Sequence, residues 1–370
     1  MTRYEIQNSE DPMSTLCRMA VQTGYTDLPE DVVRHAKHTL LDCMAVMIGG
    51  SGMDGIPAIV EMVKDKGGTP QSVLPFYGGR VPATEAALAI GPMPRAMDCG
   101  DLHEEAGHIS EYIVACLLAA TGLRPNVTGE EFLTALVVGQ ETLIRVGSAY
   151  KLISSAVKSN DCGGHYIFGA VAAVGKLLGF SQEQLENAQG IARTMTQPHT
   201  MAIYAPATLM VRVHHGLVCQ SAITACLLAE KGITGPRQEV LTGANGYLRT
   251  ARWQTDPDAL THDLGERWEM TQIITKATAP ATSPTRPSTE SSNRCAHTIS
   301  LPATSPRSTS MSPPRAGAPC ASRPTRSGIH RRFRSASSAC RTPSRPPRST
   351  RRSSCSRTRP KPGNARTSAS

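Results

Sequence analysis

The stretch Ser110-Glu-Tyr-Ile-Val-Ala-Cys-Leu-Leu-Ala-Ala120 decides the fold class of this chain. Nearly every residue in it is apolar, which is typical of a helix that is buried on most of its sides. Apolar residues also recur at helical spacing from Val32 to Ile48, and Thr128-Gly-Glu-Glu131 forms a capping box ahead of residues 132–147. Patterns typical of strands are almost absent. The sequence therefore predicts a mainly α-helical bundle.

Further helices are predicted on both sides of this stretch, at residues 56–64, 84–90, 168–178, 185–194 and 213–231. Residues 72–77 and the two glycines after them are compatible with a short strand and a turn, although Pro75 restricts such a strand to a sheet edge. No apolar run approaches the ~20 residues that a membrane-spanning helix needs. The N-terminus also lacks the apolar core of a signal peptide. We therefore expect a soluble, cytoplasmic protein.

Seven cysteines lie scattered through residues 1–276, and no pair of them has the Cys-x-x-Cys spacing. An odd number without that spacing indicates neither a zinc site nor a disulfide framework. We therefore expect reduced thiols.

Charge divides the chain into two unlike regions. Residues 277–370 hold 17 Arg, one Lys and one acidic residue, which gives +17, whereas residues 1–276 hold 21 Lys and Arg against 29 Asp and Glu, which gives −8. Together they make up the +9 of the whole chain. A positive net charge favours binding to nucleic acid or an anionic membrane, and here it belongs to residues 277–370 alone.

Residues 277–370 are rich in Ser, Pro, Thr and Arg and hold a single aromatic residue, Phe333. Such a segment cannot bury enough apolar surface to offset the entropy of the chain. We therefore predict a helical domain over residues 1–276 and a disordered tail over residues 277–370. If the tail is a genuine product, its arginines favour binding to RNA or other polyanions.

Residues 97–108, Met-Asp-Cys-Gly-Asp-Leu-His-Glu-Glu-Ala-Gly-His, hold the candidate chemistry. With Glu111 they place five acidic side chains and two imidazoles within fifteen residues, between two apolar helical segments. A core cannot bury such groups unpaired. Carboxylates beside imidazoles are the groups of general acid–base catalysis, because their surroundings can shift their pKa values towards neutrality. A solvated acidic loop is the alternative interpretation.

The same stretch bears on metal binding. His103-Glu-Glu-Ala-Gly-His108 separates its imidazoles by five positions instead of the four of a zincin motif, which places them about 140° apart on a helix. A site built from Asp98, Asp101 and His103 remains an alternative, but we expect no metal.

The ordered motifs of residues 14–276 resemble the MmgE/PrpD family, which contains 2-methylcitrate dehydratase, cis-aconitate decarboxylase and iminodisuccinate epimerase. No single motif is diagnostic, but the set follows the family's order. The motifs are Leu28-Pro29-Glu30-x-Val32 with Leu41-Asp42, Ala96-Met97-Asp98-x-x-Asp101 with His108, the run from Phe168 to Phe180, Glu183-Gln-Leu-x-x-Ala188-x-Gly-Ile-Ala192, and Arg212 with His215-Gly216.

The resemblance implies a helical domain followed by a smaller α+β lid, with the active site between them, in a homodimer formed through the helical domain. It implies a lyase that acts on a small di- or tricarboxylate by acid–base chemistry without a cofactor; an epimerase or isomerase of the same family is the alternative. A non-enzymatic helical protein with a polyanion-binding tail is the alternative from another class, and we expect no nucleic acid partner unless the tail is genuine.

The resemblance also implies roles for individual residues. By matching position, His108 is expected to carry the proton, with Asp98 as its orienting or acid–base partner. Asp101 and His103 are expected to support them. The expected substrate-binding residues are Arg212, His165, His215 and Lys276. Val211 stands where several members carry a lysine, so dehydration, decarboxylation and epimerisation all stay open.

The lid that the resemblance implies does not follow Lys276. Reading the degenerate codons of residues 284–291 (Pro-Thr-Arg-Pro-Ser-Thr-Glu-Ser) two bases later permits His-Thr-Ala-Ile-Asp-Gly-Ile, which resembles the family's lid. We therefore favour the hypothesis that residues 277–370 are an out-of-frame translation. On that hypothesis the activity of this chain is impaired. A coding sequence with no alternative open frame in this region would contradict it.

Overall fold

The computed structural model describes residues 11–151, 161–162, 164–196, 199–200, 208–250 and 255–276. Two compact units divide the chain after Ile299, and every described residue belongs to the first. The predicted tail of residues 277–370, and with it the predictions of a missing lid and an altered reading frame, lies outside the described residues.

The described part is mainly helical, which confirms the predicted fold class. Its N-terminal part supplies α1 (Pro12–Gln22), α2 (Glu30–Gly50), α3 (Ile56–Lys66), α4 (Ala83–Ile90) and α5 (Pro92–Arg95). Its central part supplies α6 (Ser110–Ala120), α7 (Gly129–Tyr150), α9 (Tyr166–Leu178), α10 (Gln182–Met195) and α11 (Met210–Glu230). Short 3-10 turns follow at η1 (Tyr25–Asp27), η3 (Tyr247–Thr250), η4 (Pro257–Leu260) and η5 (Glu269–Gln272).

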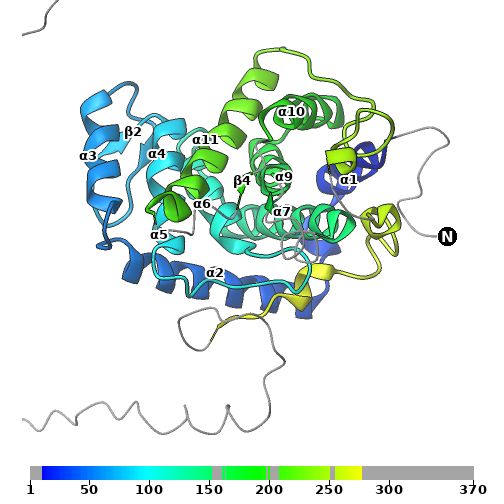
Figure 1. Cartoon of the computed structure of the whole chain (residues 1–370), viewed down its shortest axis with the longest axis horizontal. Helices are drawn as coiled ribbons and strands as arrows, with labels where there is room; N and C mark the ends of the chain where they lie inside the picture. The colour runs from blue at the N-terminus through cyan, green and yellow to red at the C-terminus, as the bar shows by residue number, and fades with distance from the viewer. Residues whose placement is uncertain are drawn as a thin grey trace, which may run out of the picture. The chain divides into compact units, whose positions relative to one another are not determined.

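The core lies where the central helices meet. α7 packs along α9, and α11 packs against α4, α6, α9 and α10 (Figure 1). The long helix α2 runs past α5, α6 and α7. As predicted, α6 is buried along almost its whole length. Among the described helices, none is long and apolar enough to cross a membrane.

Local sequence signals explain where the helices begin. The predicted capping box at Thr128 is present, with Glu131 N donating to Thr128 Oγ1 at 3.2 Å and Thr128 N donating to a Glu131 carboxylate oxygen at 2.8 Å. Ser181 and Gln184 form a second box ahead of α10. α1, which the sequence analysis did not predict, begins where Asp11 Oδ1 accepts from Met13 N at 2.9 Å.

Strands are short. β1 (Ser72–Val73) pairs antiparallel with β2 (Arg80–Val81), and β3 (Asp161–Cys162) pairs antiparallel with β4 (His199–Thr200). The strand predicted within residues 72–77 ends after two residues, because the chain turns at Leu74, whose N–H donates to the Gly79 carbonyl at 3.1 Å. Pro75, which lacks an N–H, lies inside that turn.

The segment at 255–276 is fastened to α7 by a buried ion pair. Arg145 Nε lies 2.6 Å from Glu141 Oε1, and both side chains are 1% exposed. Arg145 also donates to the carbonyl oxygens of His262 at 2.8 Å and Arg267 at 3.0 Å, while Glu141 Oε2 accepts from Met270 N at 3.0 Å. This clamp fixes the course of the chain towards Lys276.

Candidate active site

The predicted chemical stretch forms a turned loop between α5 and α6. His103 and Gly107 exchange backbone hydrogen bonds of 2.8 and 3.1 Å, with Gly107 in the left-handed region at φ 78°. Leu102 exchanges two further bonds, of 2.9 and 2.8 Å, with Ile274. The loop is therefore joined directly to the segment that ends at Lys276.

Asp101 anchors this loop to the start of α6. Its side chain is 1% exposed, accepts from the backbone N–H of Ser110 at 3.0 Å and of Ile109 at 3.4 Å, and also accepts from the Ser110 hydroxyl. Gln140 on α7 donates to that hydroxyl at 2.8 Å. Burial raises the pKa of Asp101 to about 7, although the hydrogen bonds from Ser110 oppose the shift.

His108 lies at the other end of the loop, with its side chain 16% exposed. Its Nδ1 is 3.2 Å from the Asp101 carbonyl oxygen and 3.5 Å from Glu111 Oε1. Burial lowers the pKa of His108 to about 3; the charge of Glu111 opposes that shift, whereas the positive charges of Arg95 and Lys276 add to it. The imidazole is therefore neutral at neutral pH.

His215 approaches the same place from α11. Its Nε2 lies 2.9 Å from Glu111 Oε2, and its side chain is 5% exposed. The ring stacks on Tyr112 with centroids 4.2 Å apart, and it meets the His108 ring edge-on at 6.3 Å. The structure thus brings His108 and His215, both predicted site residues, into one cluster around Glu111.

Asp98 and Lys276 lie at the exposed margin of this cluster. Asp98 adopts a left-handed backbone conformation, at φ 58°, and its carboxylate pairs with Arg95. Lys276 Nζ donates to the Asp98 carbonyl oxygen at 3.4 Å. Burial lowers the pKa of Lys276, and the carboxylates of Glu111 and Asp101 oppose the shift. Asp98 was predicted as the partner of His108, but within the described residues its ion pair is with Arg95.

Three other predicted residues lie outside the cluster. His103 Nδ1 accepts from the N–H groups of Glu105 and Ala106, each at 3.3 Å, so this ring stabilises the turn of its own loop. Burial lowers the pKa of His103 to about 4. His165 is fully buried, with Nε2 3.0 Å from the Ala106 carbonyl oxygen. Arg212 donates to the Asp54 carbonyl at 2.6 Å, ahead of α3. The roles proposed for these residues remain predictions.

Two residues of the cluster had no role in the sequence analysis. Glu111 was counted among the acidic residues but not singled out, and Arg95 was not considered. A signal for Glu111 was available, because it is the acidic residue in the first turn of an otherwise apolar helix. Only a buried partner, here the imidazole of His215, makes such a position tolerable. Within the described ranges, no three His, Cys, Asp or Glu side chains are grouped to hold a metal ion.

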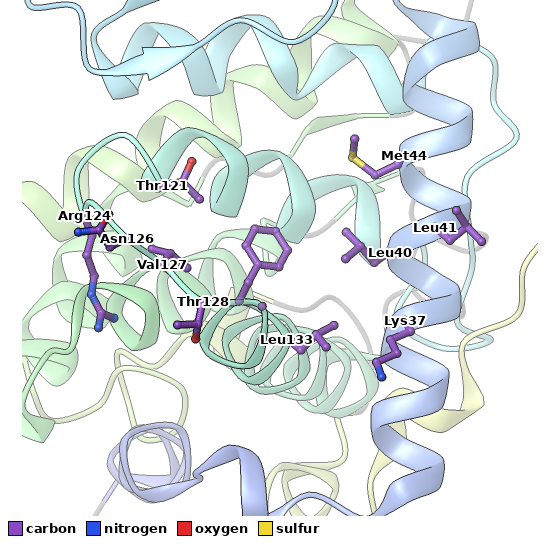
Figure 2. Close-up of a pocket in the computed structure, with 12 residues that line it drawn as sticks. Lys37, Leu40, Leu41, Met44, Thr121, Arg124, Asn126, Val127, Thr128 and Leu133 are labelled. Carbon is purple, nitrogen blue, oxygen red and sulfur yellow. The ribbon is translucent and has the colours of Figure 1, made fainter.

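An apolar groove lies beside α2 (Figure 2), and none of these groups is among its lining residues. Its cavity has a volume of about 700 Å³. Leu40, Leu41 and Met44 line it from α2, and Phe132 and Leu133 line it from α7. It contains no carboxylate or imidazole among its lining residues, so the candidate chemistry belongs to the cluster and not to this groove.

Comparison with known proteins identifies a family and relatives of this chain. Residues 14–259 match the family model described as the MmgE/PrpD N-terminal domain. The chain is 30% identical over 279 residues to the cis-aconitate decarboxylase-like protein oryM of Aspergillus oryzae, covering 70% of this chain and 57% of that protein. It is 26% identical over 246 residues to a cis-aconitate decarboxylase of Aspergillus terreus, covering 64% and 49%. The chain spans about half the length of these curated relatives.

Proposed function

The chain belongs to the MmgE/PrpD family, and on this premise we propose that it is a lyase that moves a proton at a carbon next to a carboxylate in a small di- or tricarboxylate. The names of the two relatives make cis-aconitate the first substrate to test. 2-Methylcitrate is the second, because the family also contains dehydratases.

The arrangement of His108 carries this proposal. A carbonyl oxygen only accepts hydrogen bonds, so Nδ1, 3.2 Å from the Asp101 carbonyl, holds the ring proton and Nε2 keeps its lone pair. Burial lowers the pKa of this ring and keeps it neutral, while the neighbouring Glu111 opposes that shift and favours the protonated ring that forms when a proton is taken. A neutral imidazole that is held in one orientation suits removal of a proton from carbon.

Lys276 supplies the positive charge that the reaction needs. Loss of the C–H proton leaves an electron pair on carbon that spreads into the neighbouring carboxylate, and an ammonium group there would stabilise it. In a dehydration, that pair forms the double bond as hydroxide leaves with a proton as water. In a decarboxylation, the C–C bonding pair stays on carbon as CO2 leaves, and the carbon then takes a proton.

The test is proton NMR of the purified full-length protein in D2O with cis-aconitate and, separately, 2-methylcitrate. We expect product formation or deuterium incorporation into the substrate. Deuterium exchange reports the proton-transfer step alone, whatever the rate of overall turnover.

His108→Gln should lower that exchange rate at least ~100-fold, because it removes the proton acceptor. His38→Gln, on the exposed face of α2, is the matched control and should leave the rate unchanged. A natively folded protein that exchanges no deuterium with either substrate, or a His108→Gln variant as fast as the parent, contradicts the proposal.

A further inference from the structure

Glu111 is a buried carboxylate held between two imidazoles. Its side chain is 1% exposed, with Oε1 3.5 Å from His108 Nδ1 and Oε2 2.9 Å from His215 Nε2. Within the described residues, no donor is in hydrogen-bond geometry with either oxygen, so the two rings act on this carboxylate by proximity and charge. A buried carboxylate is costly without compensation. The two imidazoles supply that compensation, and the carboxylate in turn acts on them.

Two glycines allow this arrangement. A Cβ on Gly100 would lie 1.9 Å from Glu111 Oε1, so only glycine leaves room for the carboxylate. A Cβ on Gly216 would lie 2.3 Å from the Leu88 carbonyl oxygen, so this glycine permits the close contact of α11 with α4. His215, the next residue on α11, is thereby brought to Glu111, and its stacking on Tyr112 fixes the plane of its ring.

We propose that Glu111 and His215 are positioning residues for His108: the Glu111 carboxylate keeps the ring proton of His108 on Nδ1, and His215 holds that carboxylate in place. This inference rests on the proposed function, in which His108 Nε2 must be free to accept a proton. The Asp101 carbonyl and a Glu111 carboxylate can both only accept hydrogen bonds, so together they favour a single tautomer of His108.

The other charged groups around His108 do not specify that tautomer. None of them, within the described residues, has a side-chain atom in hydrogen-bond contact with the ring. Arg95 and Lys276 are the groups whose charge acts on His108, whereas Asp42 and Cys43 on α2 lie near Glu111, and Asp98, Cys99 and Asp101 in the loop lie near Lys276.

Nitrogen-15 NMR of the full-length protein with labelled histidines tests the inference directly. In the parent protein, we expect the spectrum to show His108 with the proton on Nδ1 and none on Nε2; the spectrum of His108→Gln assigns the signal. In Glu111→Gln the amide can donate to Nδ1, so a substantial fraction of His108 should shift to the Nε2–H tautomer. Asp42→Asn is the matched control and should leave the tautomer unchanged.

Several outcomes overturn the inference. A parent protein with the proton of His108 on Nε2 does so without any variant, and so does an unchanged tautomer in a folded Glu111→Gln protein. Glu111→Asp, which keeps the charge, should retain more of the Nδ1–H form than Glu111→Gln. His215→Gln should give a mixture of both tautomers, and a pure Nδ1–H form there contradicts the part assigned to His215.

Turnover separates this inference from the proposed function. If both hold, Glu111→Gln should lower kcat at least ~100-fold with little change in KM, as expected when a base is left in the wrong tautomer. The expected tautomers without any proton exchange from substrate contradict the proposed function alone. Exchange that depends on His108, together with an unchanged tautomer in Glu111→Gln, contradicts this inference alone.

Discussion

The cluster at the start of α6 consists of buried polar groups, whereas the groove beside α2 is lined mainly by apolar side chains. In the cluster, carboxylates and imidazoles are buried close together: Asp101 and His108 bond to backbone groups, and Glu111 lies between two rings. In the groove, apolar side chains surround about 700 Å³ of open space. α2 borders both, because Asp42 and Cys43 lie near the cluster's charges whereas Leu41 and Met44 line the groove. Cavity size therefore does not identify the chemistry here; buried and mutually oriented polar groups do.

The largest expected effect contrasts the buried ion pair of the α7 clamp with a surface ion pair at the groove. Arg145→Gln removes a buried charge from Glu141 and from the carbonyls that hold residues 255–276, so it should lower the free energy of unfolding by about 3–5 kcal/mol. Arg124 lines the groove and pairs with Glu131 at the surface, so Arg124→Gln should change the free energy of unfolding by less than about 1 kcal/mol. Urea denaturation measures both, and equal losses would refute the comparison.

A second difference is in pH dependence. Burial raises the pKa of Asp101 to about 7, above its ordinary value, so the native state binds this proton more tightly than the unfolded chain. The contribution of this group to stability is therefore fully present below about pH 4 and is lost as the pH rises through 7, by an amount on the order of 3 kcal/mol between pH 4 and pH 7. Asp101→Asn should flatten the curve of unfolding free energy against pH. A variant that keeps the parent's slope would show that another group causes it.

A glycine in the cluster and a glycine beside the groove should differ in how much stability an added methyl group costs. Gly100→Ala forces a methyl group onto the Glu111 carboxylate and should destabilise the fold by about 2 kcal/mol. At Gly129, in the first turn of α7 beside the groove, a Cβ meets nothing within 4 Å, so Gly129→Ala should be neutral or stabilising by up to about 1 kcal/mol. Thermal unfolding distinguishes them. If Gly129→Ala lowered the stability as much as Gly100→Ala, the predicted contrast between the groove and the cluster would be wrong.

Helices were the most predictable part of the molecule, because their signals are local. The apolar stretch that became α6 and the capping box at Thr128 each specify their own element. α1 was missed because its amphipathic pattern is too short to indicate a helix by itself; in the structure α1 packs against α10. The strand expected within residues 72–77 was overestimated, because Pro75 ends it.

The site was predictable only in part, because its contacts join distant segments. Most of the loop of residues 97–108 is buried or half-buried, as its place between two apolar helical segments indicated. The sequence could not show that Glu111 faces His215 from another helix, because that contact depends on close helix approach at Gly216. The pairing of Asp98 with Arg95, three positions away, is local and was overlooked.

The smallest expected effect is on the groove itself. Leu41 is 70% exposed on α2, so Leu41→Ser removes little buried apolar area and should change the free energy of unfolding by less than about 0.5 kcal/mol. Leu133 lines the same groove but is 9% exposed, so Leu133→Ser should cost more. If the predicted homodimer used this face, the effect of Leu41→Ser would grow with protein concentration. Unfolding curves of the parent and Leu41→Ser proteins at two concentrations distinguish a solvent-exposed apolar surface from a buried interface.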